Sequence, residues 1–256
     1  MVLVIVGLLV GGIFVGNDLI KQFQLRSVIR EMDQFQTAIL AFRLKYNGIP
    51  GDIRNATDFF GTNPNCAAGL VGTGTETCNG NGNSEINMIG PSQDPPREQF
   101  YAWQHLANAK MINGFYTGLS DTYYECVPKV NCPTGRLNDR QAYFMATFLS
   151  RPVNHWWPYQ DALGTTVGIA RTTGAAYPAD PILTPQEAFG LDLKVDNGKP
   201  GTGYWRTFGP TGNSFGCAVN GDTLADITDA EAEQEIAIYN PTKTTVLCSF
   251  LIYYRI

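Results

Sequence analysis

The first 46 residues constrain the fold of this chain more than any other segment. Residues 1–16 are almost entirely apolar, and they are followed by a stripe in which apolar residues recur at alternating steps of three and four. This spacing places the stripe along one face of an α-helix. The stripe residues are Leu25, Val28, Met32, Phe35, Ile39, Phe42 and Tyr46.

One continuous helix is predicted over residues 1–46. No proline interrupts the pattern before Pro50, and the sequence at 47–52 supplies the glycine and proline that end a helix. At 1.5 Å per residue such a helix is roughly 68 Å long. We expect its apolar front, residues 1–24, to lie in lipid or a filament core, and its amphipathic back to belong to a globular head over 25–256.

The apolar front contains two pairs of glycines, each spaced four residues apart: Gly7 with Gly11, and Gly12 with Gly16. Small residues at this spacing let two membrane helices approach closely. No basic residue precedes the apolar run and no small-residue cleavage site follows it, so we do not expect a secretory signal peptide. The glycine pairs are therefore predicted to be helix-packing positions.

The six cysteines predict disulfide bonds. None lies in a CxxC pair, which argues against zinc ribbons and thioredoxin-like sites and favours an oxidising compartment. Spacing alone does not fix the connectivity, and buried free thiols are the alternative. We expect neighbours in sequence to pair, each bond contributing roughly 2 to 4 kcal/mol through loop entropy. The expected pairs are Cys66–Cys78, Cys126–Cys132 and Cys217–Cys248.

The head is predicted to contain an antiparallel sheet that packs on the helical stripe. Alternating apolar residues indicate strands within 141–150, 204–208 and 244–256. A sheet packed on a long helix gives an α+β fold. The predicted fold is therefore a long N-terminal helix, with an apolar front and an amphipathic back, on an antiparallel head.

Two further helices are expected in the head. One begins at an N-cap, Asp94, and ends at Gly114. The other begins after a capping box at 184–187 and ends at the Asn-Gly pair 197–198. Between Asn63 and Pro96 there is little periodic apolar sequence, which predicts a long loop.

Charge and composition exclude several classes of function. A net charge of −5 provides no basic patch for nucleic acid, so no nucleic-acid partner is expected. Only His105 and His155 could act as imidazole bases, and neither accompanies a nucleophile motif. We interpret both as packing residues and predict that the chain is not an enzyme.

Two polar segments have other candidate roles. Asp192, Asp196 and Asn197 place oxygen atoms at a spacing used by calcium loops, and they are the candidate calcium ligands; no other cofactor is expected. The acidic segment 220–236 is typical of a solvated surface. Its alternative role is a charged contact with a basic patch on a neighbouring subunit.

Residues 1–52 resemble the N-terminal helix of the type IV pilin and type II secretion pseudopilin superfamily. The segments 42–52, 98–116 and 183–203 are similar to a large-subunit branch of these proteins. The resemblance implies a single-pass anchor in the bacterial inner membrane, a periplasmic head, and an extracellular filament or pseudopilus after assembly. Several pseudopilins also bind calcium near the C-terminus, in keeping with the candidate ligands at 192–197.

The family's processing site is expected upstream of this sequence. Its members have a short basic leader, which prepilin peptidase removes before the new amine is methylated, and a glutamate a few residues later. The match here begins about seven residues inside the mature helix, so we expect the preceding codons to encode both. The leader must also decide the orientation in the membrane. Lys21, Arg26 and Arg30 alone would favour a cytoplasmic location for the chain that follows the helix.

The sequence leaves three functional hypotheses. The first is a structural filament subunit whose partners are other pilin-like subunits, in homo- or hetero-oligomers, inner-membrane lipid and prepilin peptidase. The alternative is a minor tip subunit that acts as an adhesin or binds cargo, favoured by Trp156, Trp157 and Tyr159. A membrane-anchored hydrolase is the third, and it would need a nucleophile and base that we do not find in the sequence.

Overall fold

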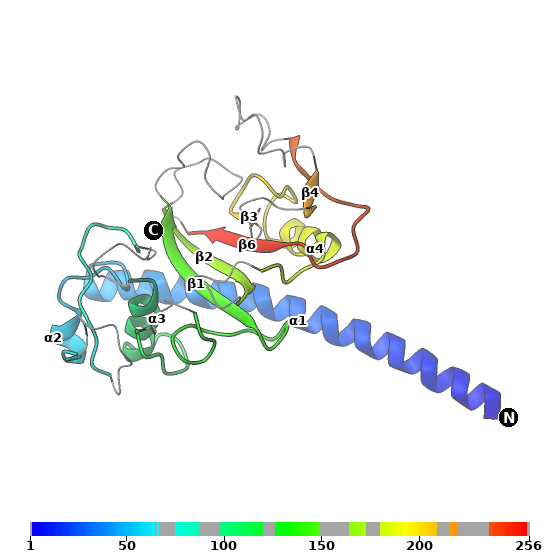
Figure 1. The fold of residues 1–256 in the computed structure, drawn as a ribbon, viewed down its shortest axis with the longest axis horizontal. Helices are drawn as coiled ribbons and strands as arrows, with labels where there is room; N and C mark the ends of the chain where they lie inside the picture. The colour runs from blue at the N-terminus through cyan, green and yellow to red at the C-terminus, as the bar shows by residue number, and fades with distance from the viewer. Residues whose placement is uncertain are drawn as a thin grey trace.

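The computed structural model describes residues 2–64, 66, 75–87, 98–119, 126–148, 164–172, 180–208, 216–219 and 236–254, without the side chains at 7–10 and 14. One long helix, α1 (Val2–Tyr46), runs the length of the molecule, and the head packs on its C-terminal half (Figure 1). The N-terminal half extends away from the head. The predicted α+β fold, with a long helix and an antiparallel sheet, is confirmed.

Helix α1 ends at Tyr46, where the sequence predicts it to end. The residue in the left-handed conformation is Asn47, with φ of 54°, and not the following glycine as expected. Asparagine adopts this conformation at lower cost than most residues, so it serves as the residue after the helix end. Gly48 has a different role, because a β-carbon there would lie 2.3 Å from a methyl group of Ile53.

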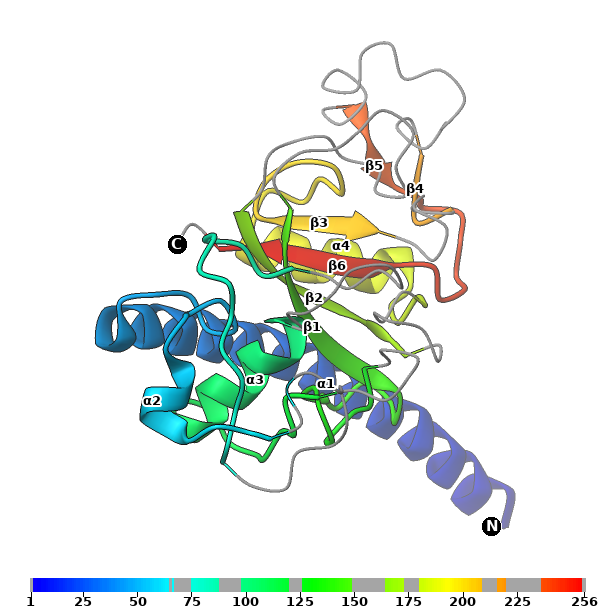
Figure 2. The ribbon, with the colours of Figure 1, turned by 60° about the vertical axis from the view of Figure 1, so that its left-hand side comes forward.

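The main sheet has four antiparallel strands in the order β1-β2-β6-β3 (Figure 2). Each of the three segments predicted to be strands contributes one, and β2 is an unpredicted fourth. A separate two-stranded ribbon pairs β4 with β5. The strands are β1 (Gln141–Phe148), β2 (Gly164–Arg171), β3 (Trp205–Phe208), β4 (Ala218–Val219), β5 (Ile238–Tyr239) and β6 (Ser249–Tyr253).

Alternate residues of the sheet belong to two different cores. Side chains such as Tyr143, Val167 and Ile252 join the main core with α1. The residues between them point the other way and form a second buried cluster, which includes Phe144 and Phe208. This is the period of two expected for a sheet covered on both faces. The sheet therefore carries the helix on one face only.

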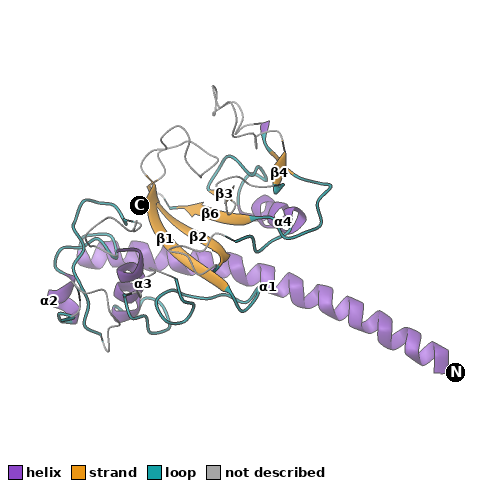
Figure 3. Cartoon of the chain, viewed as in Figure 1, coloured by secondary structure: helices purple, strands orange, loops and turns teal. Residues whose placement is uncertain are grey.

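Short helices complete the head on the side of the main core (Figure 3). They are α2 (Ala56–Phe60) and α3 (Glu98–Asn108). Prediction placed the end of α3 at Gly114, which is wrong by six residues. The amide N–H of Met111 donates to the carbonyl of Leu106, and Lys110 has φ of 62°. This arrangement closes the helix by a Schellman turn before the glycine is reached.

The second predicted head helix is present as α4 (Pro185–Val195). Thr184 and Glu187 form the predicted capping box, in which each side chain accepts a hydrogen bond from the other residue's backbone N–H. Such a cap stabilises a helix start by about 1 kcal/mol. Helix α4 lies beside α1 near the level where α1 leaves the head (Figure 1).

All six cysteines are joined in disulfides, and the pairs are Cys66–Cys78, Cys126–Cys132 and Cys217–Cys248. Cysteines thus pair with their neighbours in sequence. The third bond connects the start of the β4–β5 ribbon to the residue before β6. Three such bonds indicate an oxidising compartment for the head.

Candidate membrane and subunit interface

The front of α1 is an apolar surface that the head leaves uncovered. None of the described side chains from Val2 to Gln24 is buried. Helix α1 is long and apolar enough to cross a membrane by length and composition, and none of its most apolar 18-residue window is buried. The exposed apolar residues in this part are Val2, Leu3, Val4, Ile5, Val6, Ile13, Val15, Leu19, Ile20 and Phe23.

The predicted packing glycines lie on this exposed segment. A β-carbon built on Gly11, Gly12 or Gly16 meets no atom of the chain within 4 Å. The surroundings of Gly7 lie outside the described side chains. The head therefore imposes no steric need for glycine at the three described positions, and any such need would come from another helix.

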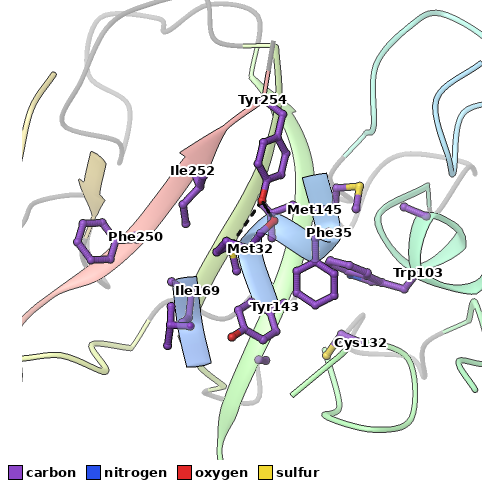
Figure 4. Packing of buried hydrophobic residues seen from close by; sticks show 14 of the residues in the cluster. Met32, Phe35, Trp103, Cys132, Tyr143, Met145, Ile169, Phe250, Ile252 and Tyr254 are labelled. Carbon is purple, nitrogen blue, oxygen red and sulfur yellow. Dashed lines mark hydrogen bonds between the residues drawn. The ribbon is translucent and has the colours of Figure 1, made fainter. Parts of the chain in front are cut away.

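The back of α1 is held in the head by the predicted stripe. Six of the seven stripe residues are buried, and Tyr46 is partly buried against the same core. The Phe35 ring packs edge-on against Trp103 of α3 and Tyr143 of β1, with 5.0 Å between ring centres in both pairs (Figure 4). Aromatic pairs of this geometry each contribute about 0.5 to 1.5 kcal/mol beyond area burial.

Polar contacts fix the register of α1 on the sheet. The hydroxyl of Tyr254 donates to the carbonyl of Met32, at 2.9 Å (Figure 4). The hydroxyl of Tyr143 donates to the Glu31 carboxylate, and accepts from Gln141. Burial raises the pKa of Glu31, while the bond from Tyr143 opposes that rise. These contacts use polar residues that the apolar stripe alone does not predict.

Basic residues begin where α1 enters the head. The ammonium group of Lys21 lies 3.2 Å from the Glu187 carboxylate of α4. Exposed ion pairs of this kind contribute about 0 to 1 kcal/mol. Arg26 and Arg30 follow at one-turn spacing, and both are exposed. The surface of α1 therefore changes from apolar to cationic within two helical turns.

The three candidate calcium ligands lie close together at the C-terminal end of α4, but protein donors hydrogen-bond to them. Asp192 accepts from the Tyr239 hydroxyl and from the backbone N–H of Gly198. Asp196 accepts from the backbone N–H of Trp205, and Asn197 from that of Lys199. Within the described residues, no group of three or more His, Cys, Asp or Glu side chains could hold a metal ion. These side chains build the turn from α4 to β3.

His105 is fully buried in α3. Its Nδ1 accepts a hydrogen bond from the backbone N–H of Gly51, and its Nε2 lies 3.0 Å from the Thr77 hydroxyl. Burial lowers the pKa of His105 to about 4, so the ring is neutral near pH 7. The imidazole therefore connects the end of α1 to the loop around Cys78, without access to solvent.

Two buried carboxyl groups hold the loop that follows Cys78. The oxygens of Glu98 accept from the backbone N–H groups of Asn81 and Asn87, at 2.8 and 2.9 Å. Asp52 accepts in the same way from Asn83 and Ser84. Sequence analysis did not identify these acids, since neither stands in a motif. Burial, which disfavours charge, raises the pKa of Glu98 to about 7.

This burial predicts that the contribution of Glu98 to the stability of the protein falls as the pH rises from about 4.5 to about 7. The folded state holds the Glu98 proton more tightly than the unfolded chain does, so the folded state binds more protons in this range. The Glu98 contribution to the free energy of unfolding should fall by on the order of 2 to 3 kcal/mol, since each unit between the two pKa values corresponds to about 1.4 kcal/mol. His105, whose pKa burial lowers to about 4, contributes with the opposite sign over most of this range, so the Glu98 part is obtained by comparison with a variant. Urea unfolding across this range measures the fall.

The matched variant is Glu98→Gln, which cannot ionise. Its stability should fall less than that of the unmodified chain between these pH values. What remains combines Asp192, whose pKa burial also raises to about 7, with the opposite effect of His105. A slope equal to that of the unmodified chain would show that Glu98 does not titrate as expected.

A groove of about 780 Å³ lies along α1 on the head. Its wall on the helix includes Phe35 and Ala38, and its opposite wall includes Tyr116 and Pro133. Charged residues of both signs, among them Glu31 and Arg136, also line it. No sequence pattern indicated this groove, because its walls come from three separate segments.

Three sequence-based candidates lie wholly or mostly outside the described residues. They are His155, the aromatic group Trp156, Trp157 and Tyr159, and the acidic segment 220–236, of which only Ile236 is described.

Comparison with known proteins gives no relative for this chain: no protein-family model matches it, no curated protein matches its sequence, and no solved structure matches it. The architecture, a long apolar N-terminal helix on an antiparallel sheet, is compatible with a pilin-like shape. The projecting helix and the disulfide-bonded head are the features on which a functional proposal can be based.

Proposed function

We propose that this chain is a structural subunit of a type IV pilus-like filament or a type II secretion pseudopilus. The observation that carries the proposal is the front of α1, an apolar helix of membrane-spanning length in which no described side chain is buried by the head. An apolar surface this large on a disulfide-bonded protein needs lipid or another protein around it. Before assembly the membrane would cover this surface with lipid, and after assembly the front helices of neighbouring subunits would cover it.

Assembly then replaces one apolar environment by another. In the bilayer, lipid tails surround residues such as Val4 and Ile13. In the filament, the front helices of neighbouring subunits would pack together at the open glycine positions, where van der Waals contact and close approach favour association. The head would stay outside this helical core, held by the buried back half of α1. No catalytic step is part of this proposal.

Cross-linking between copies tests the proposal. A photoreactive amino acid at Val15, whose side chain is 65% exposed, should give a ladder of multimers after assembly. The same chain dissolved as a monomer in detergent should give none, which is the control. Monomeric products in both samples, under conditions where heads are found in filaments by electron microscopy, would contradict a core made of front helices.

The groove on the head favours the second candidate, a minor tip subunit that binds cargo. Its mixed apolar and charged walls suit a peptide segment better than an unbranched lipid. Immunogold labelling separates the two candidates: label along the whole filament indicates a structural subunit, and label only at the ends indicates a tip subunit.

A further inference from the structure

We propose that Arg26 and Arg30 bind the headgroup of an anionic phospholipid at the level where α1 leaves the bilayer. The inference rests on the membrane stage of the proposed function and adds a lipid preference to it. Leu19, Phe23, Arg26 and Arg30 follow each other at steps of four, three and four, so they share one face of α1. All four are exposed. This face passes from apolar to cationic within about three turns.

The axial position of the arginines matches the headgroup layer. With a rise of 1.5 Å per residue, Arg26 lies about 5 Å and Arg30 about 10 Å beyond Phe23. The headgroup region is about 5 to 8 Å thick on each side of the hydrocarbon core. Helix side chains tilt toward the N-terminus, which here means toward the bilayer, so both guanidinium groups can reach this layer.

The surrounding charges leave these two arginines available for an anion. In the part of the chain that the structure describes, the ion pairs involve Lys21 and Arg171, and neither Arg26 nor Arg30 takes part in one. Of the nearby acids, Glu31 is the one whose pKa the Arg30 charge lowers, but no ion pair joins the two side chains, and the carboxylate accepts the Tyr143 hydroxyl inside the head. Asp33 is exposed one turn further from the membrane, and Asp18 precedes the pair by two turns.

A phosphate between the arginines would also relieve a local repulsion. Like charges at one-turn spacing on an isolated helix disfavour the helix slightly. A guanidinium group presents paired N–H donors that match two phosphate oxygens, and it binds phosphate more specifically than an ammonium group does. A single anionic headgroup could therefore bridge Arg26 and Arg30 while its acyl chains lie against Leu19 and Phe23.

The test measures which lipids the full chain holds at its surface. The protein is placed in vesicles of phosphatidylcholine that contain spin-labelled phosphatidylglycerol or, separately, spin-labelled phosphatidylcholine. The fraction of immobilised label gives the relative affinity. We expect a preference for the anionic lipid of at least about fivefold, the effect of one cation near a membrane surface. It should shrink at high salt, because screening shortens the range of these charges.

The variant Arg26→Gln/Arg30→Gln should abolish the preference and still insert. Arg43→Gln/Lys45→Gln is the matched control: it removes two exposed cations from the same helix about 24 Å further from the membrane, and should keep the preference. Equal affinity for both lipids in the unmodified chain, or the same loss in both variants, overturns the proposal. Flotation with vesicles of either lipid tests the membrane stage itself, so failure to insert is distinguished from insertion without lipid preference.

Discussion

Replacing Gly12 with leucine should prevent filament assembly while leaving the head as stable as before. A β-carbon at this position meets nothing within 4 Å in the chain itself, so the larger side chain cannot disturb the head. In a filament it would occupy the space through which a neighbouring helix approaches. Overpacking of a close contact costs about 1 to 3 kcal/mol, which raises the concentration needed for assembly by about 5- to 150-fold.

Two variants of the same helix serve as controls. Ile13→Leu introduces the same side chain with little change in volume and should assemble normally. Gly12→Ala should have an intermediate effect, because alanine is small and favours the helix by about 1 kcal/mol. Filament yield is measured by electron microscopy and by the amount of subunit in sheared material. Normal yield from Gly12→Leu would rule out close helix packing at this glycine.

The long helix could be predicted because its signal is redundant. Seven stripe positions repeat the same period over more than 20 residues, and the stop at 47–52 agrees with it. Such a signal survives the loss of any one residue. Boundaries that depend on a single residue were less secure. Asn47 adopts a left-handed conformation next to the glycine that was expected to end α1, and Lys110 does so four residues before Gly114, the glycine expected to end α3.

Strand β2 was missed because its sequence does not alternate in the usual way. Val167 and Ile169 are its apolar residues in the main core, and the residue between them is a glycine, Gly168. The register places Gly168 opposite Phe144, and a β-carbon there would lie 2.0 Å from the Phe144 ring. Glycine is required by the partner strand, and this requirement is invisible before the two strands are paired.

The polar part of the candidate site could be predicted only in part. The cationic turn after the apolar run is a local feature, and so are the glycine pairs. The bond from Tyr143 to Glu31 joins residues 112 positions apart, and the Asp52 bond to Ser84 joins residues 32 apart. Neither partner shows a local pattern that indicates the other. Contacts of this kind depend on how the sheet lies on the helix.

Replacing Phe42 with alanine should destabilise the head by about 3 to 5 kcal/mol, the usual cost of removing a buried phenylalanine side chain. Phe42 is fully buried, and its ring packs against Tyr46 and is stacked with His105, with 4.5 and 6.1 Å between ring centres. Small domains have only about 5 to 15 kcal/mol of stability, so a large part would be lost. Urea unfolding of the full chain in detergent micelles, followed by tryptophan fluorescence, measures the change.

The matched control lies two residues further along the same helix. Leu44 is 88% exposed, so Leu44→Ala removes an apolar side chain without opening a cavity and should change stability by less than about 0.5 kcal/mol. Phe42 and Leu44 differ in their expected effect on stability because only one face of α1 is buried in the head. If Phe42→Ala costs no more than Leu44→Ala, the back of the helix does not serve as the spine of the head, and the head would have to be stable without it.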